Sequence, residues 1–188
     1  MDRLIVHPCT KPLNGTVRVS GMTKNAGLKQ MAASLMARGK TTLSNMNSVA
    51  DLSIMCELLE SIGAKVVKEN DTCYSIDSSA ELTPEAPYEL VSKMRASINV
   101  LSPLLATVGK AKVSMPGGDN IGLRKLDMHF RALEKMGVTI ELEQGYIEAY
   151  VDKLVGARIV LEFPSVGATE NILCAAVLAK GETVIENA

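Results

Sequence analysis

The chain contains 188 residues, of which 47% are hydrophobic, 22% charged and 3% aromatic, and its formal net charge is −1. This composition is typical of a globular protein of one or two domains with a sizeable core. The balanced charge and the scarcity of aromatic rings argue against nucleic acid or an anionic membrane as a partner.

The predicted elements begin with two short β-branched runs, residues 4–6 and 17–19, which flank a turn-rich stretch and predict a hairpin-like strand pair. Apolar residues at helical spacing predict an amphipathic helix over residues 24–38, ended by Gly39 in the left-handed conformation. The elements expected after it are a strand at 41–45, a helix at 51–62 with Asp51 as its N-cap, and strands at 64–67 and 73–76.

The remaining sequence predicts a similar succession of elements. Residues 82–87 contain two prolines and predict a loop, and residues 88–107 predict a long helix that Pro103 kinks or splits. The elements expected after it are a strand at 112–115, a helix at 126–136, a hairpin of 138–142 and 146–151, a strand at 158–161, a helix at 169–179 and a strand at 183–186.

This succession is an internal repeat. Glycines that end helices recur at Gly39, Gly109 and Gly181, at offsets of 70 and 72 residues. The unit is helix, strand, helix and hairpin; it occurs twice in full, and a third copy stops after its first strand. We therefore expect an α/β domain over residues 21–188 with pseudo-threefold symmetry, helices inside and sheets outside. Its units span approximately residues 21–90, 91–160 and 161–188; an irregular α/β domain with chance glycine spacing is the alternative.

The four cysteines are scattered singly along the chain, and none forms a C-x-x-C pair. With only two histidines, the sequence offers no set of residues with zinc-ligand spacing. Scattered reduced thiols, together with the lack of a predicted signal peptide or transmembrane run, favour a cytoplasmic location.

Residues 114–124 carry the most chemistry of any stretch. They join a predicted strand to a predicted helix and contain Pro116, three glycines, Asp119 and Arg124. Glycines let the backbone approach a ligand closely, and the start of the following helix favours an anion. Asp119 has the chemistry to move protons and Arg124 to bind phosphate. The alternative is a surface turn in which Asp119 caps the helix.

The repeat and six short motifs resemble the UDP-N-acetylglucosamine enolpyruvyl transferase family. The motifs are KNA at 24–26, MRASI at 94–98, PGGxxIGxR at 116–124, DxH at 127–129, SVGAT at 165–169 and ENA at 186–188. The resemblance runs over the whole chain and covers about the first half of the family's usual length. It implies the inside-out α/β barrel of enolpyruvyl transferases, with the third repeat incomplete.

The activity implied by the resemblance is the first committed step of peptidoglycan synthesis. Enolpyruvate passes from phosphoenolpyruvate to the sugar 3-hydroxyl of UDP-N-acetylglucosamine, and phosphate is released. The resemblance implies no cofactor and no metal. Both substrates are anionic, which suits Lys and Arg side chains at helix starts. Asn25 and Arg95 hold equivalent positions in the first two copies, so two helix starts are expected to face one cleft.

The resemblance also assigns site residues. Asp119 is the proton donor, Lys24 and Arg124 assist catalysis, and Lys24 and Asn25 bind phosphoenolpyruvate. The residues that bind UDP-N-acetylglucosamine are Arg95, Arg124, Lys125, Leu126, Asp127, Met128, Phe163, Pro164, Ser165 and Val166. His7 and His129 are expected to be packed residues rather than catalysts.

The sequence departs from the family pattern at a few of these positions. Asp119 stands where most members carry cysteine, and a carboxylate is a weaker nucleophile than a thiolate. We therefore expect insensitivity to the epoxide antibiotic fosfomycin. Gly21-Met22-Thr23-Lys24 is one residue longer than the usual motif, Lys125 replaces a common proline, and Phe163 replaces a common lysine.

The resemblance further implies a second domain that supplies a general base and more arginines. Residues 1–20, as a strand pair, are expected to belong to that domain. A C-terminal half or a complementing chain is therefore the expected partner, and the 188-residue chain alone is expected to turn over weakly or not at all. Two alternatives stay open: a sister enzyme acting on shikimate phosphate, and a non-catalytic module that binds a nucleotide sugar.

Overall fold

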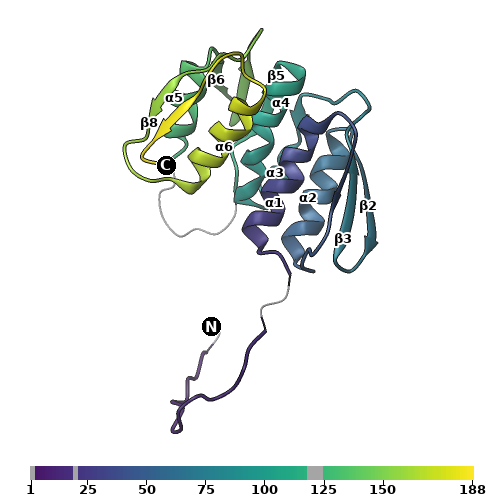
Figure 1. The fold of residues 1–188 in the computed structure, drawn as a ribbon, viewed down its shortest axis with the longest axis vertical. Coiled ribbons are helices and arrows are strands. Elements are labelled where there is room, and N and C mark those ends of the chain that lie inside the picture. Colours follow the sequence, from purple (N-terminus) through teal and green to yellow (C-terminus); the bar gives the residue numbers. More distant parts are fainter. Residues whose placement is uncertain (1–2, 19–20, 118–124) are drawn as a thin grey trace.

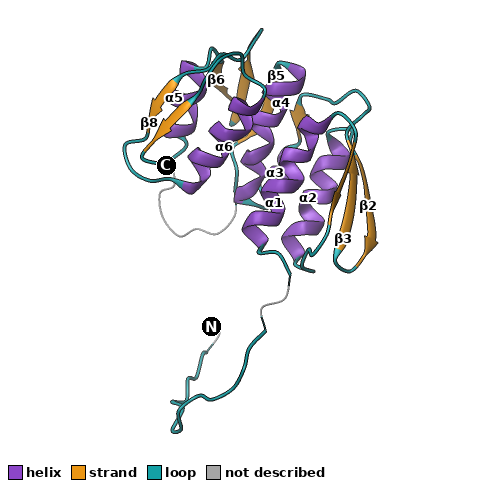
Figure 2. Cartoon of the chain, in the orientation of Figure 1, coloured by secondary structure: helices purple, strands orange, loops and turns teal. Residues whose placement is uncertain are grey.

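A computed structural model describes residues 3–18, 21–117 and 125–188 of the chain. The helices pack against one another in the centre of the molecule, and the strands form sheets at its periphery (Figure 1 and Figure 2). The predicted layering, with helices inside and sheets outside, is therefore confirmed.

The first unit has the predicted order of helix, strand, helix and hairpin. Its helix starts where the Thr23 hydroxyl accepts a hydrogen bond of 3.2 Å from the amide of Ala26. The second helix begins after Val49, and Asp51 lies in its first turn, so the prediction of Asp51 as N-cap is wrong. The elements are α1 Lys24–Ala33, the 3₁₀ helix η1 Ser34–Ala37, β1 Lys40–Leu43, α2 Ala50–Ser61, β2 Lys65–Asn70 and β3 Cys73–Asp77.

The second unit repeats this order, but the helix predicted over residues 88–107 is divided into three pieces. Pro103 lies in the first turn of the last piece, where the N–H that proline lacks has no helical partner to lose. The elements are β4 Glu85–Ala86, α3 Tyr88–Val91, the 3₁₀ helix η2 Arg95–Val100, α4 Leu101–Val108, β5 Lys110–Ser114, α5 Asp127–Lys135, β6 Thr139–Glu143 and β7 Tyr146–Tyr150.

The third unit comprises one helix and a strand pair among the described residues. Its elements are β8 Arg158–Val160, α6 Val166–Val177 and β9 Val184–Glu186. Leu35 and Leu105, which the repeat aligns with Val177, are 0% and 2% exposed, whereas Val177 is 69% exposed. The third helix therefore presents to solvent a face that its counterparts bury.

The described strands form three sheets. β3 lies between β1 and β2 and is antiparallel to both, and the second sheet has the order β4-β5-β7-β6. β4 is parallel to β5 and β8 is parallel to β9, so a short parallel strand precedes the helices of the second and third units. Strand β4 was not predicted, because two residues are too few to show periodicity.

The turns that end the inner helices show how closely the copies correspond. Gly109 ends α4 in the left-handed conformation with a φ of 78°, whereas Gly181, with a φ of 97°, lies beyond the end of α6 at Val177 and its cap Leu178. In the first unit Arg38 takes this conformation with a φ of 49°, so the prediction for Gly39 is wrong by one residue. The Arg38 guanidinium donates a hydrogen bond of 3.1 Å to the carbonyl of Thr107, at the end of α4. Arg38 therefore ties the first unit to the second.

Residues 3–18 form no strand, and in Figure 1 they extend away from the helices and sheets. The predicted strand pair is therefore not formed by this part of the chain. The side chains of Leu4, Ile5 and Val17 are 89%, 62% and 89% exposed, so the described part of the chain packs little against them. An isolated hairpin without such packing is marginal in water.

Within the described ranges, none of the helices has the length and apolarity that a membrane span requires.

Candidate active site

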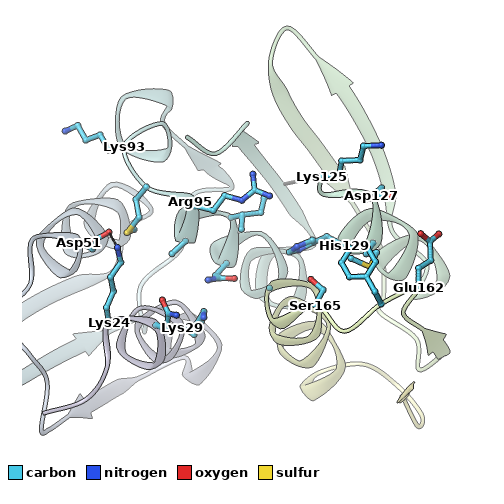
Figure 3. Close-up of a pocket in the computed structure, with 18 residues that line it drawn as sticks. Lys24, Lys29, Asp51, Lys93, Arg95, Lys125, Asp127, His129, Glu162 and Ser165 are labelled. Carbon is cyan, nitrogen blue, oxygen red and sulfur yellow. Dashed lines mark ion pairs between the residues drawn. The ribbon is translucent and has the colours of Figure 1, made fainter. Parts of the chain in front are cut away.

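A pocket of about 900 Å³ lies where the starts of four helical segments, α1, η2, α5 and α6, converge (Figure 3). The first backbone N–H groups of a helix have no intrahelical partner, and the helix dipole adds positive charge there, so such a site favours anions. The pocket is lined by Lys24, Asn25, Lys29, Asp51, Lys93, Met94, Arg95, Ala96, Ile98, Asn99, Lys125, Asp127, Met128, His129, Glu162, Phe163, Ser165 and Gly167.

The charged side chains of the lining are mostly cationic. Four lysines and Arg95 face three carboxylates among the described lining residues, which leaves the wall net positive. Lys24 Nζ lies 2.7 Å from Asp51 Oδ1, and Figure 3 shows the two side chains pointing toward one another. Lys29 Nζ lies 2.8 Å from Glu170 Oε2, so this pair joins α1 to α6. Two of the lysines therefore already hold a counter-ion.

Arg95 is placed by the break in the second unit. Met94 has extended backbone, with φ −148° and ψ 128°, and the chain turns into η2 at Arg95. The Ser97 hydroxyl donates a hydrogen bond of 2.8 Å to the carbonyl of Val91, which holds η2 against α3. Asn25 and Arg95 both line the pocket from helix starts, as the repeat predicts.

His129 is only 5% exposed and lies in the first turns of α5. The pKa of His129 is lowered to about 4, mainly by burial and to a smaller extent by the nearby positive charge of Arg95, while the negative charge of Asp127 opposes the shift. The imidazole is therefore neutral at physiological pH. The expectation that His129 is a packed residue holds for its burial, yet its ring also forms part of the pocket wall.

Backbone geometry next to the glycine-rich stretch is tight. A Cβ added at Gly117 would lie 1.8 Å from the carbonyl oxygen of Ser92, so only glycine fits at this position. The Gly117 amide donates a hydrogen bond of 3.4 Å to the carbonyl of Val91. The chain that leaves β5 therefore runs along the segment that carries Lys93 and Arg95.

The residues predicted from the sequence divide into three groups. Three of them, Leu126, Pro164 and Val166, do not line the pocket; Leu126 is buried, whereas Pro164 and Val166 are exposed. Asp119 and Arg124 lie outside the described residues. Those that line the pocket are Lys24, Asn25, Arg95, Lys125, Asp127, Met128, Phe163 and Ser165.

Several residues that line the pocket were not predicted as site residues from the sequence, among them Lys29, Asp51 and Lys93. The signal for Lys29 was present, because it is a charged residue between Leu28 and Met31 in a helix predicted to be buried. Within the part of the chain that the structure describes, no group of three or more His, Cys, Asp and Glu side chains could hold a metal ion.

The sequence of the chain is similar to a known protein family and to proteins with assigned names. The sequence pattern of the EPSP synthase (3-phosphoshikimate 1-carboxyvinyltransferase) family matches residues 8–188. Two proteins named UDP-N-acetylglucosamine 1-carboxyvinyltransferase, from Solidesulfovibrio magneticus and Lawsonia intracellularis, are 48% and 50% identical to the chain over 188 residues. The chain spans 44% of the length of each.

Comparison of structures shows the fold. The enolpyruvyl transferase NikO from Streptomyces tendae superposes on 94% of the chain with a TM-score of 0.77 and 21% identity, using 41% of its own length. EPSP synthase from Acinetobacter baumannii covers 91% of the chain with a TM-score of 0.71 and 18% identity, using 40% of its own length. The predicted enolpyruvyl transferase fold is therefore confirmed.

Proposed function

The chain belongs to the EPSP synthase (3-phosphoshikimate 1-carboxyvinyltransferase) family, and from this premise we propose that it is the N-terminal portion of a UDP-N-acetylglucosamine enolpyruvyl transferase. The whole protein would transfer enolpyruvate from phosphoenolpyruvate to the sugar 3-hydroxyl and release phosphate. The observation that carries the proposal is the convergence of four helix starts on one cationic pocket. The names of the relatives at 48% and 50% identity support this choice of sugar substrate.

In this proposal the two substrates occupy different parts of the pocket wall. Lys24 and Asn25, at the start of α1, bind phosphoenolpyruvate, because an ammonium and unpaired helix amides suit its phosphate. Arg95, Lys125 and the start of α6 at Ser165 bind the nucleotide sugar. A volume of about 900 Å³ is of the size that ligands with several rings require.

The proposed chemistry is an addition followed by an elimination. Asp119 delivers a proton to the methylene carbon of phosphoenolpyruvate while the sugar hydroxyl loses its proton and attacks the adjacent carbon. The product is a tetrahedral ketal. Loss of a proton from the new methyl group then restores the double bond and expels phosphate, whose charge Lys24 and Arg124 stabilise. We assign the general base to the remainder of the protein.

No step of this proposal calls for a metal or an organic cofactor, because lysine and arginine neutralise the phosphate charge. The proposed partner is the C-terminal remainder or a chain that complements it, and the proposed location is the cytoplasm. Residues 1–20 are proposed to pack with that remainder, and residues 21–188 to form the repeat domain.

A second candidate is a module that binds the nucleotide sugar without catalysis, since the cationic pocket by itself accounts for binding. A sister enzyme acting on shikimate phosphate is less well supported, since the relatives at 48% and 50% identity have another name.

The test is phosphate release in a complemented enzyme. The 188-residue chain would be mixed with the separately produced C-terminal part of the Lawsonia intracellularis relative and supplied with phosphoenolpyruvate. We expect phosphate release with UDP-N-acetylglucosamine, none with shikimate 3-phosphate, and a loss of at least about 100-fold in the Lys24→Gln variant. Binding of UDP-N-acetylglucosamine without turnover would favour the binding module, and turnover of shikimate 3-phosphate alone would refute the proposal.

A further inference from the structure

A buried polar network lies behind the pocket wall and connects the second unit to the third. Ser102 in α4 and Asn171 in α6 are 0% and 1% exposed. The Ser102 hydroxyl donates to Oδ1 of Asn171, and Nδ2 of Asn171 donates a hydrogen bond of 3.3 Å to the carbonyl of Ile98. The same Nδ2 lies 3.2 Å from Nδ1 of His129. The network therefore ends on a side chain of the pocket.

The partners of Asn171 determine the tautomer of His129. A carbonyl oxygen only accepts hydrogen bonds, so the atom that faces Ile98 must be the amide nitrogen, and the oxygen then faces the Ser102 hydroxyl. The second hydrogen of the amide nitrogen points toward Nδ1 of His129, which must accept it. A neutral imidazole with an accepting Nδ1 carries its hydrogen on Nε2.

The Nε2 edge of the ring lies beside the first turn of α6. A Cβ added at Gly167 would lie 3.5 Å from both Nε2 and Cε1 of His129. The Ser165 hydroxyl caps the helix by accepting a hydrogen bond of 3.3 Å from the amide of Ala168. The amides of Val166 and Gly167 precede the first intrahelical hydrogen bond of α6, which runs from the Thr169 amide to the Ser165 carbonyl. His129 thus adds an N–H donor to a helix start that favours anions.

We propose that Asn171 is a positioning residue that holds His129 as its Nε2–H tautomer, so that the ring donates a hydrogen bond to a diphosphate oxygen at the start of α6. The inference rests on the proposed function, which supplies the diphosphate of UDP-N-acetylglucosamine. The low pKa of His129, caused by burial and by Arg95 and opposed by Asp127, keeps this donor neutral. Asn171 and His129 thereby gain roles that sequence reasoning did not give them.

A purely structural role makes a different prediction. If the network only holds α4, α5 and α6 together, its removal lowers stability but leaves the affinity for a diphosphate ligand unchanged. The tautomer of His129 and the affinity for ligands that differ only in the diphosphate therefore distinguish the two roles.

The first measurement is the nitrogen NMR spectrum of the chain labelled at histidine, which contains only His7 and His129. A His7→Gln variant assigns the two rings. We expect His129 in the wild-type chain at neutral pH to carry its proton on Nε2 and to lack one on Nδ1. In Asn171→Asp the carboxylate accepts a hydrogen bond from the ring, so a proton should appear on Nδ1. A proton on Nδ1 in the wild-type chain would overturn the proposal.

The second measurement is the affinity of the chain for UDP-N-acetylglucosamine, UDP and uridine, measured by calorimetry. We expect Asn171→Leu and His129→Phe to bind the first two ligands about 10-fold more weakly and uridine unchanged, since one hydrogen bond to a charged group is lost. Ser34→Ala is the matched control, because its hydroxyl is buried and bonded to the carbonyl of Met31 away from the pocket. Unchanged affinity for UDP in both variants would refute the donor role.

The two measurements separate this inference from the proposed function. If the wild-type chain binds neither UDP-N-acetylglucosamine nor UDP, the proposed function fails and the donor role fails with it, while the NMR spectrum still decides the tautomer. If the wild-type chain binds both ligands and the Asn171→Leu and His129→Phe variants bind them as tightly as the wild type, the proposed function stands and the donor role is refuted.

Discussion

The ammonium nitrogen of Lys24 lies 2.7 Å from Oδ1 of Asp51, so the cation assigned to phosphoenolpyruvate already has a partner of opposite charge. The two residues come from the starts of α1 and α2, which pack against each other in the first unit. An anionic ligand at Lys24 must therefore either displace this carboxylate or share the ammonium with it.

Replacing Asp51 by Asn should strengthen the binding of phosphoenolpyruvate or inorganic phosphate to the chain. The side chains are 49% and 27% exposed, and such ion pairs contribute about 0.2–1 kcal/mol, so we expect a gain of about 1.4- to 5-fold that shrinks at high salt. Calorimetric titration measures this. Asp71→Asn is the control, because it removes an ion pair of 2.9 Å with Lys68 away from the pocket. Weaker binding in Asp51→Asn would show that Asp51 holds Lys24 in place instead.

Because position 119 is an aspartate, we predict that fosfomycin forms no covalent adduct with the protein; a carboxylate attacks an epoxide more slowly than a thiolate does. Intact mass measured after incubation with the antibiotic should be unchanged in the wild-type protein. The Asp119→Cys variant should gain the mass of one inhibitor, and peptide mapping should place it at residue 119. Burial raises the pKa of the Cys56 thiol to about 11 and also raises that of Cys174, so these thiols should not compete. An adduct on wild-type Asp119 would contradict the prediction.

The protein should become less stable as the pH is lowered, because His129 resists protonation in the folded chain. The pKa of this ring is lowered from 6.5 to about 4 in the folded chain, so between these values the unfolded chain binds a proton that the folded chain does not. The free energy of unfolding should therefore decrease by about 3 kcal/mol as the pH falls from 6.5 to 4. Urea unfolding at several pH values measures the slope, which should be shallower in His129→Phe. Equal slopes in the two proteins would count against this account.

Gly117→Ala should destabilise the chain and impair ligand binding together. The new Cβ would meet the carbonyl oxygen of Ser92 at 1.8 Å, so the backbone must move beside the segment that carries Arg95. Overpacking of this kind costs about 1–3 kcal/mol, which thermal unfolding would detect. Gly15→Ala is the matched control, since a Cβ there meets nothing within 4 Å. A Gly117→Ala variant as stable as Gly15→Ala would show that this approach relaxes freely.

Most of the fold was predictable because equivalent positions in the copies of the unit predict the same succession of helices and strands. The hairpin around Gln144 and Gly145 was located by two residues that both take positive φ, 48° and 83°. The left-handed turn at Arg38 was not predictable from local preference, since Gly39 next to it takes that conformation at lower cost. A tertiary bond from Arg38 to Thr107 accompanies the less favourable choice.

The candidate site was partly predictable for a similar reason. Lys24, Asn25 and Arg95 occupy helix starts, and repetition brings such starts together. Asn171 carried only a weak signal, a polar residue in a largely apolar helix, and its role depends on contacts with His129 and Ser102 from other helices. The strand pair near the N-terminus was predicted from two short β-branched runs and the turn-rich stretch between them, and such a pattern does not say whether another layer covers the strands.

The ion pair between Lys29 and Glu170 bears on how the protein is made. These residues lie about 140 positions apart, so at about 5–20 residues per second a ribosome adds Glu170 about 7–28 seconds after Lys29. During that interval helix α1, which carries Lys29, has been synthesised but helix α6, which carries Glu170, has not. The wall of the pocket therefore closes late in synthesis, and the nascent chain must keep this lysine solvated until then.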